Sequence, residues 1–309
     1  MTYKSTSIPK PVNEPILTYL PGSTEKTSLK AKLHELKSQQ IEVPLIIGGE
    51  EIKTGQMGEM RLPHDHQHLL GSFHKAGEKE VKMAIDAALT AWKIWSKTSM
   101  EDRARIFLKA ADLLAGPWRD TINAATMLNM SKNAFQAEVD AACEMIDFFR
   151  FNAWYSHELR EHQPMYSPEG MQNTLELRPL EGFIFAVSPF NFTSIGGNLP
   201  TAPALTGCVS LWKPSSSAVY SAYCVMKLLE EAGLPPGVVN FIPGSGGDVG
   251  DPVLRSPDLA GIHFTGSTAT FQHMWGTVGA NISNMKYYPR IVGETGGKDF
   301  IFAHPSSDL

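Results

Sequence analysis

The second half of this chain alternates short apolar runs with longer segments of helical character, and this rhythm constrains the fold more than any other feature. Five runs long enough for buried strands occupy residues 183–187, 208–212, 238–242, 261–264 and 290–293. Near-continuous apolar strands joined by helices are typical of a parallel sheet with both faces covered. Because crossovers between parallel strands are right-handed, the sequence predicts a doubly wound α/β fold.

The first 160 residues predict an extended arm followed by several helices. Prolines recur between positions 9 and 21, which indicates an extended start. Apolar runs at 43–47 and 51–54 flank two glycines, which is typical of a β-hairpin. Apolar residues at helical spacing, with Ser99 as an N-cap and Gly116 as a stop signal, predict helices. The expected helices cover about 28–39, 81–95, 99–116 and 137–152.

Composition argues against several kinds of partner. Hydrophobic residues make up 42% and charged residues 19%, which allows a sizeable core. The formal net charge of −5 argues against a nucleic-acid-binding surface. No apolar stretch reaches the length needed to cross a bilayer, so no membrane partner is expected.

Cys143, Cys208 and Cys224 lie far apart without a CxxC pair, which indicates free, buried thiols in a reducing compartment.

In a sheet of this kind, ligands bind at the carboxyl ends of the strands, so the residues that follow each strand are candidates for a site. Five such loops are rich in Gly, Ser, Asn, Lys or Glu. They cover residues 188–192, 213–216, 243–247, 265–267 and 294–298. Because the carboxyl ends of parallel strands meet at one edge, we expect these loops to form a single polar site.

Each loop, taken alone, allows a structural as well as a functional interpretation. Residues 244–250 approximate a dinucleotide-binding glycine turn, but a plain strand-to-helix turn fits equally well. Ser267 is either a helix N-cap or part of a pyrophosphate site. Lys213 is either a solvated strand end or a donor to ribose hydroxyls or a 2′-phosphate. Asn191 is a turn residue or an oxyanion donor, and Glu294 faces solvent or acts as a general base.

The segment His64-Asp-His-Gln-His68 places three histidines at period two, hence on one face if it forms a strand. A zinc site normally needs a closed set of ligands, and no fourth ligand can be nominated. The favoured interpretation is a polar, solvent-facing edge strand, and no metal is expected.

Taken together and in this order, the loops resemble those of the aldehyde dehydrogenase superfamily. The shared pattern is Pro-Phe-Asn-Phe, Lys-Pro-Ser, Pro-Gly, Phe-Thr-Gly-Ser and Gly-Glu-Thr-Gly-Gly-Lys. Within the superfamily the chain most resembles the Δ1-pyrroline-5-carboxylate dehydrogenases, through residues 13–23, 146–152, 188–198 and 288–298. The resemblance implies a Rossmann-like fold. It divides the chain into an arm and hairpin at 1–60, an NAD(P)-binding domain at 61–294 and the start of a catalytic domain at 295–309.

The resemblance also implies roles in catalysis and substrate binding. Asn191 would hold the oxyanion of a thiohemiacetal with its side-chain amide. Glu294 would activate the water that hydrolyses a thioester. Phe192 would line the tunnel for the aliphatic part of the substrate, and Glu144 would approach the substrate's amino group.

NAD is the implied cofactor. Lys213 would contact the adenosine ribose, while Gly246, Val249 and Ser267 would face the adenine and the pyrophosphate. Ser216 stands where many superfamily members carry a glutamate that binds both ribose hydroxyls, so NADP remains possible. The implied cofactor-binding residues are Ser188, Pro189, Phe190, Lys213, Ser215, Ser216, Gly246, Val249, Thr265, Gly266 and Ser267.

The resemblance implies that the full-length protein oxidises L-glutamate γ-semialdehyde, formed from Δ1-pyrroline-5-carboxylate, to L-glutamate in proline degradation. In the family the nucleophilic cysteine lies downstream of the catalytic glutamate, past Leu309, so the 309-residue chain alone is expected not to turn over aldehyde. The alternative is a truncated, catalytically dead dinucleotide-binding fragment, and a fusion to a proline dehydrogenase is disfavoured because the arm begins at Met1. A homodimer or larger assembly is expected at full length, in a bacterial cytoplasm or a mitochondrial matrix.

Overall fold

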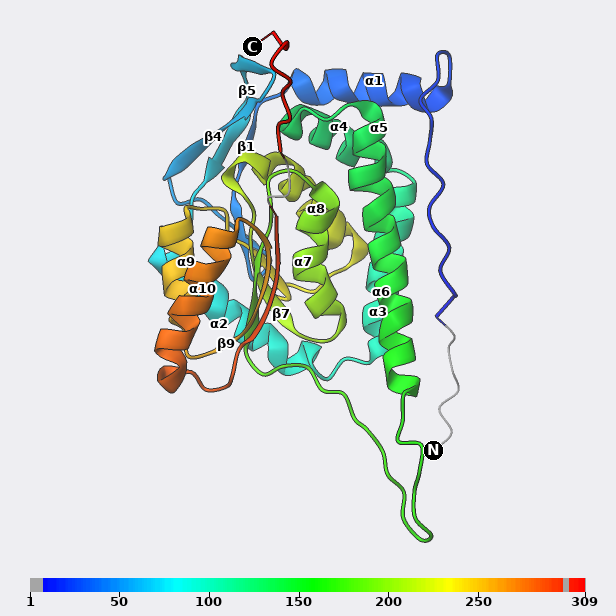
Figure 1. The fold of residues 1–309 in the computed structure, drawn as a ribbon, viewed down its shortest axis with the longest axis vertical. Coiled ribbons are helices and arrows are strands. Elements are labelled where there is room, and N and C mark those ends of the chain that lie inside the picture. Colours follow the sequence, from blue (N-terminus) through cyan, green and yellow to red (C-terminus); the bar gives the residue numbers. More distant parts are fainter. Residues whose placement is uncertain (1–7, 297–299, 309) are drawn as a thin grey trace.

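The computed structural model, drawn in Figure 1, describes residues 8–296 and 300–308. Its main sheet has seven strands in the order β10-β9-β6-β7-β8-β2-β3. The first five strands in this order run parallel to one another. They are β6 (Phe183–Val187), β7 (Val209–Lys213), β8 (Val239–Phe241), β9 (Leu259–Gly266) and β10 (Arg290–Thr295). All five strands predicted from the apolar runs are therefore confirmed, with ends shifted by a few residues at most.

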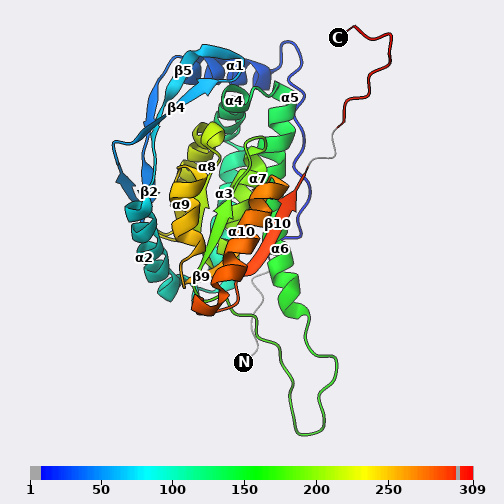
Figure 2. The ribbon, with the colours of Figure 1, turned by 60° about the vertical axis from the view of Figure 1, so that its left-hand side comes forward.

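Helices cover both faces of this sheet, which confirms the doubly wound prediction (Figure 2). One face carries α2 (Glu78–Trp95), α9 (Gly246–Leu254) and α10 (Thr268–Asn281). The other carries α7 (Thr193–Leu205) and α8 (Val219–Ala232). Outside α7 and α8 pack α3 (Met100–Ala115), α4 (Arg119–Met130) and α6 (Glu144–Glu161).

The predicted hairpin is also present. Strands β2 (Leu45–Ile47) and β3 (Glu50–Ile52) pair antiparallel, and β2 pairs with β8. The hairpin therefore extends the same sheet that carries the predicted cofactor loops. The proposed boundaries at residues 60 and 294 remain a prediction.

A second sheet has three strands in the order β1 (Ile41–Val43), β5 (Asp65–His74) and β4 (Met57–Leu62). Residues 65–69 of β5 pair with β4 alone, whereas residues 71–73 also pair with β1. The histidine-rich start of β5 is thus a polar edge of the sheet, as predicted, whereas the later part of β5 lies between two strands. Within residues 8–296 and 300–308, no group of side chains is arranged to hold a metal ion.

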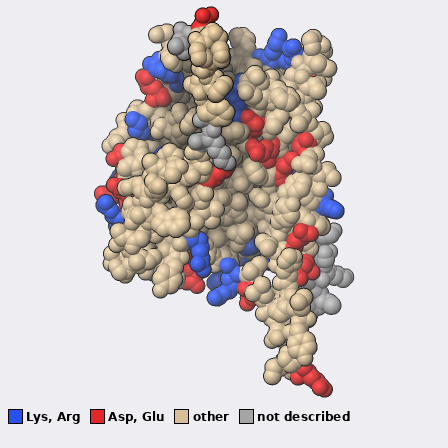
Figure 3. Space-filling model, in the orientation of Figure 1, with Lys and Arg blue, Asp and Glu red and all other residues tan. Residues whose placement is uncertain are grey.

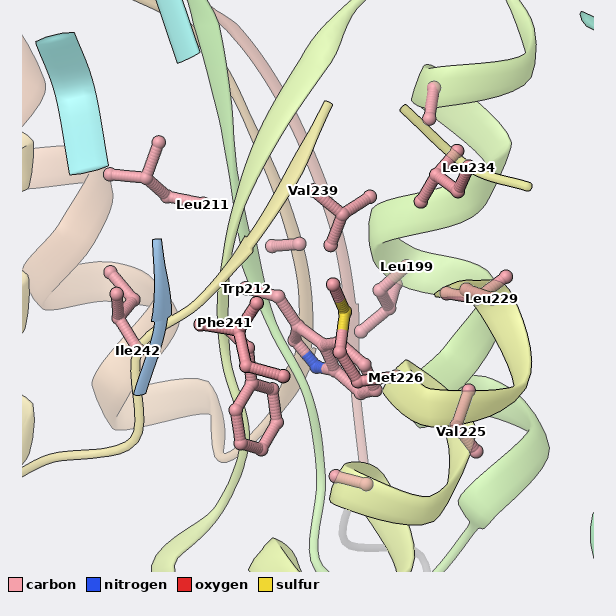
Figure 4. Close-up of a cluster of buried hydrophobic side chains, with 14 of the residues drawn as sticks. Leu199, Leu211, Trp212, Val225, Met226, Leu229, Leu234, Val239, Phe241 and Ile242 are labelled. Carbon is pink, nitrogen blue, oxygen red and sulfur yellow. The ribbon is translucent and has the colours of Figure 1, made fainter. Parts of the chain in front are cut away.

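The core of the sheet follows from the alternation of side chains along each strand (Figure 4). Leu211 of β7 points to one side, while the next residue, Trp212, points towards α7 and α8. Trp212 is fully buried, and its ring packs edge-on against Phe241 with 5.3 Å between the centroids. Its indole Nε1 donates to the Ser188 hydroxyl at 2.9 Å. The core thereby holds the first residue of the first candidate loop.

Helix ends follow the capping residues. Ser99 accepts a hydrogen bond from the Asp102 amide at 3.1 Å, and Gly116 ends α3, as predicted. Helix α1 (Thr24–Lys37) begins earlier than predicted because Ser23 caps it, accepting from the Lys26 amide. A side-chain oxygen at this position satisfies an amide that has no partner within the helix.

The helix predicted at 137–152 is composite. It begins with α5 (Ala134–Ala137), continues as the π-helical turn η1 (Glu138–Cys143), and runs on as α6 to residue 161. Nothing in the residue pattern predicted the π-helical turn, which makes hydrogen bonds five residues apart instead of four.

Two irregular segments frame the molecule. The arm, residues 8–23, runs along α6, and residues 162–182 project beyond the end of that helix (Figure 1).

On the face seen in Figure 3, basic and acidic side chains are both scattered over the surface. Among the helices of the described residues, none is both long and apolar enough to span a membrane.

Candidate cofactor and substrate site

Four of the predicted loops begin at neighbouring strand ends. Val187, the last residue of β6, pairs with Lys213 at the end of β7 and with Phe264 of β9. Glu294 of β10 pairs in turn with Thr265 of β9. Because these four strands are parallel, the loops that follow them meet at one edge of the sheet. The convergence expected from the sequence is therefore present.

Lys213 carries a buried ammonium at this edge. The residue exposes only 9% of its surface, and Nζ donates a single long hydrogen bond, of 3.4 Å, to the Pro214 carbonyl. Burial lowers the pKa of Lys213. An ammonium has three donors, and leaving them short of acceptors in a buried position is costly. The site therefore suits a ligand that brings hydroxyl or phosphate oxygens to Lys213.

Two helices begin at this edge with serine N-caps. Ser245 accepts from the Asp248 amide at 3.0 Å at the start of α9, and Ser267 accepts from the Thr270 amide at 3.2 Å at the start of α10. The N-cap interpretation of Ser267 is therefore confirmed. A Cβ added to Gly246, the first residue of α9, would meet nothing within 4 Å. The start of α9 is therefore open, and free helix amides together with the helix dipole favour an anion there.

The other predicted cofactor residues differ in exposure. Pro189 and Val249 are buried. Val249 has no exposed surface, so its contact with an adenine remains a prediction. The residues that are half-buried or exposed are Phe190, Ser215, Ser216, Thr265 and Gly266.

Phe192 and Asn191 precede α7, and a lysine side chain packs over the face of the Phe192 ring. The Lys132 ammonium lies 3.8 Å from the centroid of the Phe192 ring and 2.5 Å from a carboxylate oxygen of Asp140. A cation over an aromatic face stabilises that ring position. Asn191 is exposed, as an oxyanion donor in an open site would be. Its role in holding an oxyanion remains a prediction.

Glu144 lies beside these residues, at the first position of α6. Its carboxylate accepts a hydrogen bond from the Ser194 hydroxyl of α7. Burial raises the pKa of Glu144, and the negative charges of Asp140 and Glu294 raise it further, against the lowering effects of Ser194 and Lys132. Glu294 thus affects the charge of Glu144, although the two residues are 150 positions apart in sequence. Residues 297–298 of the fifth predicted loop lie outside the described residues.

Sequence reasoning missed Lys132, Asp140 and Ser194. A signal existed for Asp140, because a carboxylate four residues before Glu144 shares a helix face with it. Ser194 lies within the stretch 188–198 that carried the resemblance, without being singled out. Lys132 follows the end of α4 and had no pattern to distinguish it from a solvated lysine.

A comparison with models of known protein families identifies the family of this chain. The model of the aldehyde dehydrogenase family matches residues 52–309. The chain belongs to the aldehyde dehydrogenase family. The resemblance inferred from the five loops is thereby confirmed.

Several similar proteins are Δ1-pyrroline-5-carboxylate dehydrogenases. The Δ1-pyrroline-5-carboxylate dehydrogenase of Agaricus bisporus is 50% identical over 303 residues, which cover 98% of this chain and 55% of that protein. The mitochondrial enzyme of the mouse is 47% identical over 309 residues, which cover 100% of this chain and 55% of that protein. The Mycobacterium tuberculosis enzyme bound with NAD superposes with a TM-score of 0.95 at 50% identity, over 99% of this chain and 57% of that one. The chain therefore spans about half the length of the relatives it matches.

Proposed function

We propose that these residues belong to an NAD(P)-dependent dehydrogenase that oxidises L-glutamate γ-semialdehyde to L-glutamate. The observation that carries the proposal is the identity of 47–50% to Δ1-pyrroline-5-carboxylate dehydrogenases over nearly all of this chain. The sheet edge at which Lys213, Ser267 and Glu294 end or follow neighbouring parallel strands supports it.

NAD fits the edge formed by β7, α9 and α10. Lys213 would donate to ribose hydroxyls, which supplies the acceptors that its buried ammonium lacks. The open helix starts at Gly246 and Ser267 would receive the pyrophosphate. When bound, the dinucleotide supplies the hydride acceptor for aldehyde oxidation. The exposed Ser216 brings no carboxylate to exclude a 2′-phosphate, so NADP remains an open alternative to NAD.

Chain residues would do the remaining work at the reacting carbon. Asn191 would donate to the developing oxyanion, and Glu294 would deprotonate the attacking water. Glu144 would bind the ammonium of the amino-acid substrate, and that positive charge would favour its ionised form. The aliphatic part of the substrate would lie on Phe192, whose ring Lys132 holds in place.

The three thiols of this chain are poor candidates for the nucleophile. Burial raises the pKa of Cys143 and that of Cys224 each to about 12, and burial also raises the pKa of Cys208. The thiolate is the reactive form, so a raised pKa makes a cysteine inert. We therefore expect no aldehyde oxidation by the 309-residue chain. Steady NADH formation that disappears in a Cys143→Ser, Cys208→Ser or Cys224→Ser variant would contradict this.

Cofactor binding can be tested on the 309-residue chain itself. Lys213→Met is expected to weaken NAD binding about 10–100-fold, because a hydrogen bond from a charged group contributes about 1.5–3 kcal/mol. Isothermal titration calorimetry measures the affinity. Lys53→Met, at a side chain that is 60% exposed, is the matched control and should leave the affinity unchanged. Equal affinities in the wild type and Lys213→Met would remove Lys213 from the cofactor site.

The proposed function is tested on the polypeptide that the gene encodes in frame beyond Leu309. If it reaches the length of the relatives, it should form NADH from Δ1-pyrroline-5-carboxylate. Failure of such a full-length protein to oxidise this substrate would refute the proposal. A stop codon after Leu309 would leave dinucleotide binding as the most this product could do. The oligomeric state and the bacterial or mitochondrial location are further expectations. Sedimentation of the purified full-length protein would test the first, and fractionation of the source cells would test the second.

A further inference from the structure

The π-helical turn η1 lies between the N-terminal arm and the candidate substrate site. It spans Glu138–Cys143 and leads directly into Glu144. Single π-helical turns inside α-helices occur frequently at functional sites, because they alter the direction of the residues that follow. Each end of this turn is tied to a different part of the molecule.

The first end of the turn is tied to the arm through Glu138, whose carboxylate is completely buried. It accepts hydrogen bonds from the Leu17 amide and the Tyr19 hydroxyl, each at 2.8 Å. Asn123 donates to it at 2.8 Å, and Arg119 donates to it as well. Burial alone would raise the pKa of Glu138, but the hydrogen bonds from Arg119, Leu17 and Tyr19 outweigh burial and lower it.

Further contacts hold the arm in place. Arg119 also donates to Glu14 at 2.6 Å and to the Pro15 carbonyl at 2.8 Å. The second oxygen of Glu14 accepts from Arg150 at 2.7 Å. The Glu14 amide donates to Asp147 at 2.8 Å. The arm is therefore attached by charged and buried groups on α4, η1 and α6.

The other end of the turn faces the candidate substrate site. Asp140 pairs with Lys132, which lies over Phe192. Glu144, the residue after the turn, accepts from Ser194. Glu138 on the arm side and Glu144 on the site side are therefore six positions apart in one continuous helix.

The extra residue in a π-helical turn is costly unless contacts hold it. If Glu138 lost its donors, relaxation of the turn to an α-helix would change the register of one flank against the other by one residue. That change corresponds to a rotation of about 100°. Such a rotation would move Asp140 and Glu144 off the face that meets Lys132 and Ser194. The contacts of the arm with Glu138 oppose this rotation.

We propose that the N-terminal arm is a positioning element of the substrate site, in which Tyr19 and Leu17, through Glu138, hold the π-helical turn that aims Glu144 at Ser194. Tyr19 and Glu138 are then positioning residues and do not touch the substrate themselves. The ligand whose binding they control is the ammonium group of an amino-acid aldehyde. This step rests on the proposed function.

The first test needs no activity and uses the 309-residue chain. Tyr19→Phe removes one donor to Glu138 and keeps the ring, which is 92% buried in its pocket since Tyr19 exposes 8% of its surface. Backbone hydrogen exchange at residues 138–145, measured by mass spectrometry, should become about 5–30-fold faster. Alkylation of Cys143, which lies beneath the arm, should accelerate in parallel. Exchange in β6, β7 and β9 should not change, which separates this effect from general destabilisation.

Tyr155→Phe is the matched control, because this tyrosine lies on α6 and is 53% exposed. It should leave exchange at residues 138–145 and the rate of Cys143 alkylation unchanged. Unaltered exchange at 138–145 in Tyr19→Phe would overturn the proposal, whatever the substrate of the enzyme.

The second test uses the protein at the length of its relatives. In Tyr19→Phe, KM for L-glutamate γ-semialdehyde should rise about 5–30-fold, while KM for NAD and for glutarate semialdehyde, which lacks the amino group, should stay constant. An unchanged KM for the amino-acid aldehyde would overturn the role of the arm in substrate positioning. A third outcome combines faster exchange in Tyr19→Phe with a full-length wild type that oxidises no semialdehyde. It would refute the proposed function but leave the role of Tyr19 in holding the π-helical turn intact.

Discussion

Replacing Arg119 by methionine is expected to lower the free energy of unfolding by about 3–5 kcal/mol. The Arg119 side chain is 8% exposed and pairs with Glu14 and with the fully buried Glu138. Removing the arginine leaves the Glu138 carboxylate buried without its cation. An uncompensated buried charge destabilises a protein much more than the loss of the ion pair alone would suggest.

The measurement is urea unfolding followed by circular dichroism, with linear extrapolation to water. Arg105→Met is the matched control, since the same substitution there breaks an ion pair with Asp102 in which both side chains are more than half exposed. Exposed pairs contribute at most about 1 kcal/mol, so the control should remain close to the wild type. Similar losses in the two variants would mean that Arg119 acts through general effects of arginine removal and not through Glu138.

The stability difference between the wild type and Arg119→Met should depend on pH in a defined direction. In the wild type the pKa of Glu138 is lowered, so its contribution is present at neutral pH and is lost as the pH falls through the folded-state pKa. In Arg119→Met burial would dominate and raise that pKa, so the carboxyl would destabilise the fold as the pH rises through it. The stability difference between the two proteins should therefore be largest near neutral pH and shrink towards about pH 4.

The parts of this molecule that were predictable from sequence are those that depend on local pattern. The runs that became β6 to β10 consist mainly of apolar residues, which is the pattern that a parallel strand covered on both faces leaves in a sequence. Caps such as Ser99 and Ser267 act over three residues, so they can be seen in a short window. The rule that ligands bind at the carboxyl ends of parallel strands then located the candidate site.

The parts that were not predictable depend on residues far apart in the chain. The hydrogen bond from Tyr19 to Glu138 spans 119 residues, and the one from Ser194 to Glu144 spans 50. A buried glutamate in a helix has the sequence signature of a solvated one until its partners are known. The π-helical turn has the same origin, because tertiary contacts to Glu138 and not the local residue types hold it.

Replacing Glu294 by glutamine is expected to reduce steady-state aldehyde oxidation about 100–10,000-fold in a protein of the relatives' full length. The amide keeps the size of the side chain but cannot accept a proton from water. Reduction of NAD precedes hydrolysis of the thioester in the proposed reaction. The first turnover should therefore survive in the variant, and hydrolysis should become rate-limiting.

Stopped-flow absorbance of NADH measures both phases in one experiment. The wild type should show continuous turnover, and Glu294→Gln should show one rapid equivalent of NADH per site followed by a nearly flat phase. Glu176→Gln, on the projecting segment 162–182, is the control and should behave as the wild type does. Loss of the rapid phase together with turnover would show that Glu294 acts before or during the reduction of NAD. Glu294, whose charge raises the pKa of Glu144, would then act in substrate binding, with the general base elsewhere in the protein.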